Sequence, residues 1–347
     1  MGYDPRCPAN CVLIASGLQT CSPWCSDAGL PHDNDAQVSG ALVCIGGRTG
    51  MSALLSGLKS FGLEPWAITG VFDNGSSTGE LSRSLLIPGI GDAAGCLAAL
   101  SAVADLANYR FPAGPWAGHP VKNVLAAASV LRNGGDLQKG LDDLASLLQA
   151  QGRVIVAALE AAELVATTSL GTRVLGESLI GATSDLVSVE LTPPVVAAPL
   201  AIDVVKGAKA LVIAPGSLFT SVTASLLPKG ISEAIRTSQA PMIGVVNLTT
   251  EQFETTGVSA DEHVDFIEGF VGRKADLWIA DTSSWAQLNG EDAGPGRVFI
   301  RPRRHAGRCL FADVRPDDRS PVHSPEKLAR AVAAALAKVV EARRHVA

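Results

Sequence analysis

Several apolar runs in this sequence are followed at once by glycine and hydroxyl residues, a composition that suits the binding of phosphate groups. Glycine lets a backbone approach a phosphate closely because it has no Cβ, and a helix that starts there adds free N–H groups. The first such segment consists of Gly46, Gly47, Arg48, Thr49 and Gly50. It is neither a P-loop nor the six-residue dinucleotide pattern, so alone it equally fits a ligand-free strand-to-helix turn. We expect it to bind the phosphates of a nucleotide.

Two further segments carry an acid beside glycines. Asp73 opens residues 73–79, which include the hydroxyl residues Ser76 and Ser77, and Asp92 ends residues 88–92. Carboxylates at strand ends suit a hydrated Mg²⁺, so we expect Asp73 and Asp92 to be catalytic and magnesium-binding, and the two serines to bind nucleotide. An Asp-Asn-Gly turn often needs no ligand, however, and Asp92 fits the N-cap of a helix equally well.

Two more apolar runs end in polar residues. Residues 215–221 open a predicted helix with Gly216, Ser217 and Thr220 near free N–H groups, which predicts a second anion site. Asn247 ends another run, where its amide could read a base or a sugar. We expect these four residues to contact the nucleotide as well.

The elements that position these segments are those of an α/β fold. Short apolar runs predict strands at residues 41–45, 66–72, 210–214, 242–248 and 276–280. Apolar residues at helical spacing predict helices at residues 51–61, 91–107, 123–131, 137–148 and from Ser324 onward. The alternation predicts a Rossmann-like, mostly parallel sheet, which binds ligands beyond the carboxyl ends of its strands.

The rest of the chain sets the expected domain organisation. Residues 39–347 are expected to form one nucleotide-binding domain, with a small strand-rich insertion at about 153–192. Residues 1–38 contain Cys7, Cys11, Cys21 and Cys25 and are expected to form a mobile leader, with a zinc site as the alternative. Three other cysteines lie in apolar surroundings and are expected to be buried: Cys44, Cys96 and Cys309.

Composition excludes some classes of partner. The 347 residues are 47% hydrophobic and 18% charged, which favours a globular core over disorder. A formal net charge of −6 gives no basic footprint for a nucleic acid. No apolar run is long enough to suggest a membrane span, and no secretion signal is visible. We expect a cytoplasmic protein without a membrane or nucleic-acid partner, and a symmetric homodimer because related sheets commonly pair.

Taken together, the motifs resemble those of the YvcK-type gluconeogenesis factors, which share a superfamily with 2-phospho-L-lactate transferase (CofD). The resemblance covers about residues 40–340. It rests on the order of the segments 46–50, 73–79, 88–92, 118–123, 176–178 and 215–221, with matches at Asn247–Leu248 and at residues 257–263. By this resemblance Thr49, Asp73, Asn123, Ser217 and Asn247 should face the ligand.

The resemblance implies two functions. YvcK-type proteins are known for binding UDP-sugars, which implies a regulatory or metabolic protein that binds a nucleotide or nucleotide-sugar. The alternative is a Mg²⁺-dependent transferase of the CofD type. It would move a phospho-acyl group, such as 2-phospholactate, from a nucleoside diphosphate-linked donor to a hydroxyl acceptor and release a nucleoside monophosphate.

Two departures from the family pattern add positive charge, because Arg48 and Lys122 stand where the family has glycine. Arg48 could bind the phosphates through two N–H groups, or its side chain could occupy the volume of the phosphates and abolish binding.

Other basic and histidine residues receive structural interpretations first. His119 and His263 could act as acid–base groups, but without a visible nucleophile partner we interpret them as structural. A late basic cluster either lies in a solvated loop or lines a substrate entrance; it contains Arg301, Arg303, Arg304, His305 and Arg308.

Overall fold

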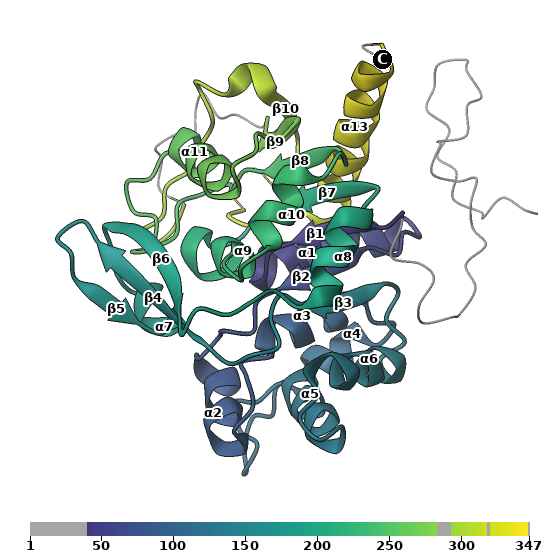
Figure 1. Cartoon of the computed structure of the whole chain (residues 1–347), viewed down its shortest axis with the longest axis vertical. Coiled ribbons are helices and arrows are strands. Elements are labelled where there is room, and N and C mark those ends of the chain that lie inside the picture. Colours follow the sequence, from purple (N-terminus) through teal and green to yellow (C-terminus); the bar gives the residue numbers. More distant parts are fainter. Residues whose placement is uncertain (1–39, 283–292, 318–319, 346–347) are drawn as a thin grey trace, which may run out of the picture. The chain divides into compact units, whose positions relative to one another are not determined.

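The computed structural model describes residues 40–282, 293–317 and 320–345. The predicted leader at residues 1–38, with its four cysteines, lies outside the described residues. Figure 1 shows a central sheet surrounded by helices, with a small separate sheet beside it.

Seven parallel strands form the main sheet in the described part of the chain. In spatial order they are β10 (Cys309–Ala312), β9 (Leu277–Asp281), β8 (Met242–Val245), β7 (Ala210–Ile213), β1 (Leu42–Ile45), β2 (Trp66–Thr69) and β3 (Arg153–Val156). The predicted Rossmann-like α/β fold is therefore confirmed. The predicted strands correspond to β1, β2, β7, β8 and β9, whereas β10 was not predicted.

The order of the strands reverses at β1. This strand pairs with β2 on one side and with β7 on the other, and Val43 lies opposite both Trp66 and Leu211. The carboxyl ends of the three strands therefore lie level with one another. In open α/β sheets the crevice at such a reversal is where ligands bind.

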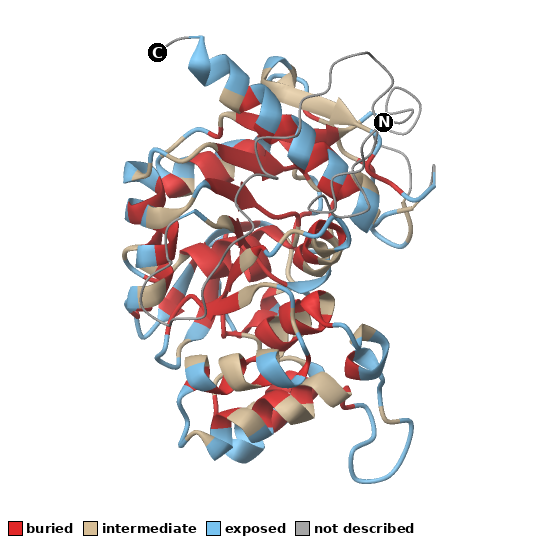
Figure 2. Ribbon diagram, turned by 90° about the vertical axis from the view of Figure 1, so that its right-hand side faces the viewer, coloured by how far each residue is buried: buried red, intermediate tan, exposed pale blue. Residues whose placement is uncertain are grey.

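Helices and short helical turns connect the strands. They are α1 (Arg48–Ser60), α2 (Ser76–Leu85), α3 (Gly91–Leu100), α4 (Ala104–Asn108), α5 (Val121–Arg132), α6 (Leu137–Leu147), α8 (Pro199–Gly207), the π-helix η1 (Leu218–Thr223), α9 (Ala224–Leu226), α10 (Ile231–Thr237), α11 (Ala260–Val271), the 3₁₀-helix η2 (Ala306–Arg308) and α13 (Pro325–Arg344). Helix α1 packs against α3 and α13, and α8 packs against α10. The buried residues gather on the strands and on the inward sides of the helices (Figure 2). None of the described helices is both long and apolar enough to cross a membrane.

Several helix boundaries differ from the prediction. Helix α1 begins at Arg48, so residues 48–50 form its first turn instead of a loop. Helix α2 was predicted as loop because its sequence is mostly polar and small. The single helix predicted at 91–107 is two helices, because Ser101 has extended backbone and its hydroxyl bonds the Leu148 carbonyl.

A second, antiparallel sheet has the order β5 (Arg173–Leu175), β4 (Glu163–Thr168) and β6 (Leu186–Thr192). The short helix α7 (Glu177–Ile180) lies between β5 and β6 in the chain. This small sheet is the predicted strand-rich insertion, but it begins at Glu163. Residues 153–156 instead pair with β2 and form β3 at the edge of the main sheet. A short β-branched run such as Val154–Val156 fits an edge strand and a strand of an insertion equally well.

Several predicted structural residues can be placed. Cys44 and Cys96 are buried as predicted, whereas Cys309 is only partly buried. The late basic cluster packs on α11, because Arg304 and His305 pair with Asp265 and Arg308 pairs with Glu268. The Arg304 side chain is nevertheless 62% exposed, so these contacts do not contradict the predicted solvated loop.

Helix α11 carries a histidine that should make folding sensitive to acid. His263 is 2% exposed, and burial lowers its pKa from 6.5 to about 4. The unfolded chain therefore binds a proton at pH 5 that the folded protein does not, and stability is lost as the pH falls below 6.5. We expect His263 to account for a loss of about 2 kcal/mol in unfolding free energy between pH 7 and pH 5.

Urea denaturation at the two pH values measures this loss, and His263→Gln should reduce it by that amount. His323, whose pKa burial also lowers to about 4, is left in place and accounts for acid sensitivity that remains. An unchanged pH dependence in His263→Gln would show that this residue is not a source of the instability.

Candidate functional site

The first turn of α1 lies at the strand-order reversal and is shaped by close contacts. A Cβ at Gly47 would overlap the Asp92 carboxylate, and a Cβ at Gly50 would overlap the carbonyl oxygen of Pro215. The protein itself therefore requires glycine at both positions. The first amides of a helix have no acceptor within the helix, so this turn also presents N–H groups at the reversal.

Arg48 joins three segments that are far apart in the sequence. Its Nη1 lies 2.7 Å from Oε1 of Glu177 in α7 and 3.4 Å from Oγ1 of Thr220 in η1. The Arg48 side chain is 44% exposed, whereas the Glu177 side chain is 4% exposed. A half-exposed guanidinium is thus anchored on one side and accessible to a ligand on the other.

Three carboxyl groups surround this guanidinium. Burial raises the pKa of Asp92 to about 7, helped by the nearby Asp73 and opposed by Arg48. Burial also raises the pKa of Glu177 to about 8, opposed by Arg48 and helped by Asp73, with which Glu177 shares a hydrogen bond. Near neutral pH, therefore, Asp92 and Glu177 are partly protonated, which reduces the negative charge of this cluster.

Asp92 does not have the N-cap role that the sequence left open. It lies in the first turn of α3, and the N-cap is Ile90. Its carboxylate instead accepts a hydrogen bond from the backbone N–H of Arg48. An acid from α3 therefore already satisfies one amide of the α1 turn.

The predicted anion site at residues 215–221 is already occupied by a side chain of the protein. One carboxylate oxygen of Glu254 accepts bonds from the N–H groups of Phe219 (2.8 Å) and Thr220 (3.1 Å). Its other oxygen accepts a bond from the Thr220 hydroxyl at 2.9 Å. Glu254 is 3% exposed, so this carboxylate fills the place where a phosphate was expected.

Asn247 and its neighbours on this side serve the backbone. The Asn247 side chain accepts a bond from the Gly216 N–H at 2.9 Å and donates one to the Gly216 carbonyl at 2.8 Å. Both groups of its amide are therefore engaged within the protein. Ser217 precedes η1 and is 4% exposed. These residues support the carboxyl end of β7 and leave little polar surface for a ligand.

A second polar group lies where α2 meets α5. The Ser77 hydroxyl lies 2.9 Å from Nδ1 of His119 and accepts a bond from Asn123 Nδ2 at 3.1 Å. His119 is 4% exposed, in keeping with its structural interpretation. Ser76, which begins α2, has a left-handed φ of 41°. The hydrogen bonds of this group connect α2 to α5.

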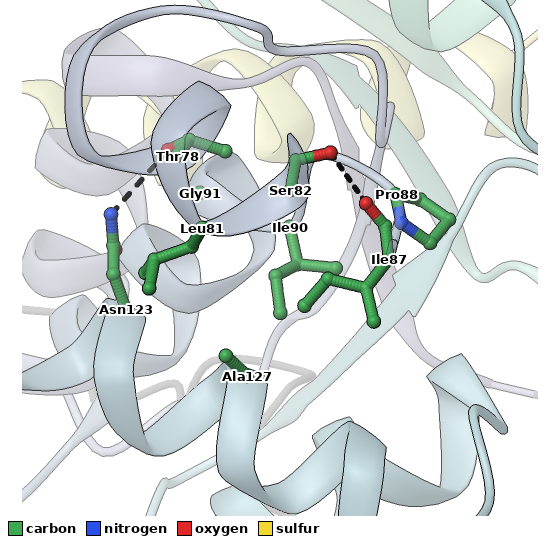
Figure 3. A pocket seen from close by; sticks show the side chains of 9 residues that line it. All are labelled: Thr78, Leu81, Ser82, Ile87, Pro88, Ile90, Gly91, Asn123 and Ala127. Atoms are coloured by element: carbon green, nitrogen blue, oxygen red, sulfur yellow. Dashed lines mark hydrogen bonds between the residues drawn. The ribbon is translucent and has the colours of Figure 1, made fainter. Parts of the chain in front are cut away.

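Asn123 also lines a small pocket between α2, residues 87–91 and α5 (Figure 3). Its amide donates toward Thr78, while its Oδ1 has no hydrogen-bond partner among the described residues. The other lining residues are mostly apolar: Leu81, Ile87, Pro88, Ile90 and Ala127. The pocket has room for about one water-sized molecule, so it is too small for a nucleotide.

The structure thus divides the predicted site residues into groups. Arg48, Asp73 and Asp92 gather at the strand-order reversal. Gly216, Ser217, Thr220 and Asn247 form the wall built on β7, where Thr220 also contacts Arg48. Glu177 and Glu254 were not predicted individually; only the match at residues 176–178 pointed to Glu177.

A preformed magnesium site is not seen in the described residues. No group of three or more His, Cys, Asp or Glu residues among them is arranged to hold a metal ion. Asp92 accepts the Arg48 N–H, and Oδ1 of Asp73 accepts the Gly75 N–H at 2.8 Å. One oxygen of each predicted ligand is therefore engaged by the backbone, and the charge of Arg48 beside them disfavours a metal ion.

The buried Glu254 carboxylate should be important for stability. We expect Glu254→Ala to lower the unfolding free energy by about 3 kcal/mol, because it leaves two buried N–H groups and a hydroxyl without their acceptor. Glu233→Ala is the matched control: Glu233 pairs with Arg236 on the surface of α10 and should contribute less than about 1 kcal/mol. Urea denaturation measures both, and equal losses would contradict a structural role for Glu254.

Comparisons with known proteins agree with the fold. The family described as 2-phospho-L-lactate transferase CofD matches residues 42–294. A gluconeogenesis factor of Listeria monocytogenes is 31% identical over 307 residues, which cover 85% of this chain and 95% of that protein. A gluconeogenesis factor of Bacillus subtilis is 35% identical over 238 residues, covering 67% and 75% respectively. A crystal structure of a Bacillus halodurans protein superposes with a TM-score of 0.75 at 30% identity, covering 86% of this chain and 99% of that one.

Proposed function

The chain belongs to the family described as 2-phospho-L-lactate transferase CofD, and from this membership we propose that it binds a nucleotide-sugar of the UDP-sugar type. The site is the crevice at the carboxyl ends of β1, β2 and β7. Its role is regulatory or metabolic, and binding requires no covalent step.

The observation that carries this proposal is the position of Arg48. Its half-exposed guanidinium lies at the strand-order reversal, in the first turn of a helix whose N-terminus attracts anions. A guanidinium can bind a phosphate through two parallel N–H groups. A diphosphate bound here would accept hydrogen bonds from Arg48 and would so replace part of the contact between Arg48 and Glu177.

The geometry changes where the diphosphate is expected to lie. The sequence predicts anion sites at both residues 46–50 and 215–221, but Glu254 already binds the N–H groups of Phe219 and Thr220. The proposed position is therefore on the α1 side, against Arg48 and the amides of residues 49–50. Asp73, on the other side and only partly buried, is suited to accept a hydrogen bond from a sugar hydroxyl.

The transferase remains the second function predicted from the resemblance, and the family is described as a transferase. It would need Asp73 and Asp92 to hold Mg²⁺ beside the positive charge of Arg48, and one oxygen of each acid is already engaged by a backbone N–H group, of residue 75 and of residue 48 respectively. No contact of the described residues favours this function over binding.

Thermal unfolding with and without ligand tests the proposal. We expect UDP-glucose or UDP-N-acetylglucosamine to raise the melting temperature, with a stabilisation that grows as the logarithm of free ligand above its dissociation constant. GDP, GTP and uridine serve as comparisons, each with Mg²⁺ and with EDTA. No shift with any nucleotide well above millimolar concentration would overturn the proposal, and a product formed from the stabilising ligand would favour the transferase.

A further inference from the structure

We infer that Arg48 supplies, from within the protein, the positive charge that a divalent metal would otherwise bring to the acids at the strand-order reversal. The acids of the cluster are Asp73, Asp92 and Glu177. The inference deepens the proposed function, since it says how a diphosphate is bound there without a metal.

The backbone of Arg48 indicates that the arginine is held there against a local cost. Its φ is 56°, in the left-handed region that favours glycine. A residue with a side chain is less stable than glycine in this conformation. Such strain persists where the surrounding contacts fix it, and it is often found at functional sites.

The contacts that fix the side chain are those of a cation among anions. Arg48 Nη1 lies 2.7 Å from the Glu177 carboxylate, and the charges of Asp92 and Asp73 act on the same guanidinium. These acids come from three segments: Asp73 follows β2, Asp92 lies at the start of α3 and Glu177 lies at the start of α7. The guanidinium is the common partner that lets them lie close together.

The backbone engages only part of the carboxylate oxygens in this cluster. Asp92 accepts the Arg48 N–H, Asp73 accepts the Gly75 N–H, and Asp73 and Glu177 bond to each other. Mg²⁺ demands near-octahedral oxygen ligands, whereas a guanidinium bonds to carboxylates as they already lie. With the guanidinium in place, the described acids already have a cation beside them, and its positive charge disfavours a divalent metal ion.

Mn²⁺ is a spectroscopic substitute for Mg²⁺, and its binding can be measured without any nucleotide. We expect titration monitored by electron paramagnetic resonance to show no Mn²⁺ bound by the wild-type protein below about millimolar concentration. Arg48→Gly removes the cation and relieves the left-handed strain, so it should fold and bind Mn²⁺ about tenfold more tightly, a difference of about 1.4 kcal/mol. Arg48→Lys keeps a cation and should behave like the wild type.

Two further variants complete the test. Arg48→Gly combined with Asp73→Asn should lose the gained Mn²⁺ binding, which assigns it to this cluster. Arg48→Asn, whose side chain tolerates a left-handed backbone, replaces Arg48→Gly if circular dichroism shows that the glycine variant is unfolded. The inference is overturned if the wild type binds Mn²⁺ as tightly as Arg48→Gly. It is also overturned if Arg48→Gly, or Arg48→Asn in its place, is folded but binds Mn²⁺ no more tightly than the wild type. Because no nucleotide is present, either result is distinct from a failure of the proposed function.

Discussion

Replacing Arg48 with glycine is expected to weaken the binding of UDP-glucose about tenfold or more when divalent metals are absent. The variant loses charge-assisted hydrogen bonds to phosphate oxygens, each contributing about 1.5–3 kcal/mol, or about 10–100-fold in affinity. Isothermal titration calorimetry in EDTA measures the change. Added Mg²⁺ should restore part of the affinity in Arg48→Gly and change little in the wild type.

The same experiment decides between two interpretations of Arg48. If its side chain fills the space of the phosphates, Arg48→Gly will bind UDP-glucose more tightly than the wild type in EDTA, and the proposed role is wrong. Arg173→Ala is the matched control, because Arg173 is an exposed arginine that pairs with Glu190 at 2.7 Å in the small sheet. It should leave the affinity unchanged.

Replacing Gly50 with alanine is expected to damage both the fold and the site. The new Cβ would overlap the Pro215 carbonyl oxygen and press on the Gly216 N–H, so the ends of β1 and β7 must move apart. We expect a loss of about 3 kcal/mol in unfolding free energy, as for other overpacked positions, and loss of UDP-glucose binding. Urea denaturation and calorimetry measure the two effects.

Gly269→Ala provides the control for Gly50→Ala. Gly269 lies in α11, and a Cβ there would meet no atom within 4 Å. An alanine in an ordinary helix position is more stable than glycine by about 0.5–1 kcal/mol. Equal destabilisation by the two substitutions, or unchanged ligand binding in Gly50→Ala, would contradict the role of close packing between residues 46–50 and 215–216.

The strands at the centre of the sheet could be predicted because their sequences are continuous apolar runs. Residues 43–45 and 210–213 are apolar throughout and are buried on both faces. Helix α2 could not be predicted in the same way. Of its residues 76–85, only Ser77, Thr78, Gly79 and Leu81 are buried, so small residues that carry no apolar signal form its inner face.

Only the site residues that lie next to a predicted strand or helix could be predicted from the sequence. Arg48, Asp73 and Asp92 each follow an apolar run or precede a helix, and parallel strands bring such residues to one edge. Glu177 and Glu254 reach the same region from the small sheet and from the segment after β8, and their partners Arg48 and Thr220 lie 129 and 34 residues away. A pairing over such distances depends on how the elements pack, and no local pattern records it.

The role of residues 215–221 shows the same limit. Glycine, serine and threonine before a helix are typical of an anion site. The anion that the structure places there is the Glu254 carboxylate. A single sequence cannot distinguish a helix start that binds a ligand from one that binds a buried acid of the same chain.

A crystal structure of the wild-type protein with UDP-glucose, grown in EDTA, tests the central claim most directly. We expect the diphosphate to lie within hydrogen-bonding distance of the Arg48 guanidinium and of the first turn of α1, with Glu254 still bound to residues 219–220. A diphosphate bound at residues 215–221 with Glu254 displaced, or one that makes no contact with Arg48, would contradict the account.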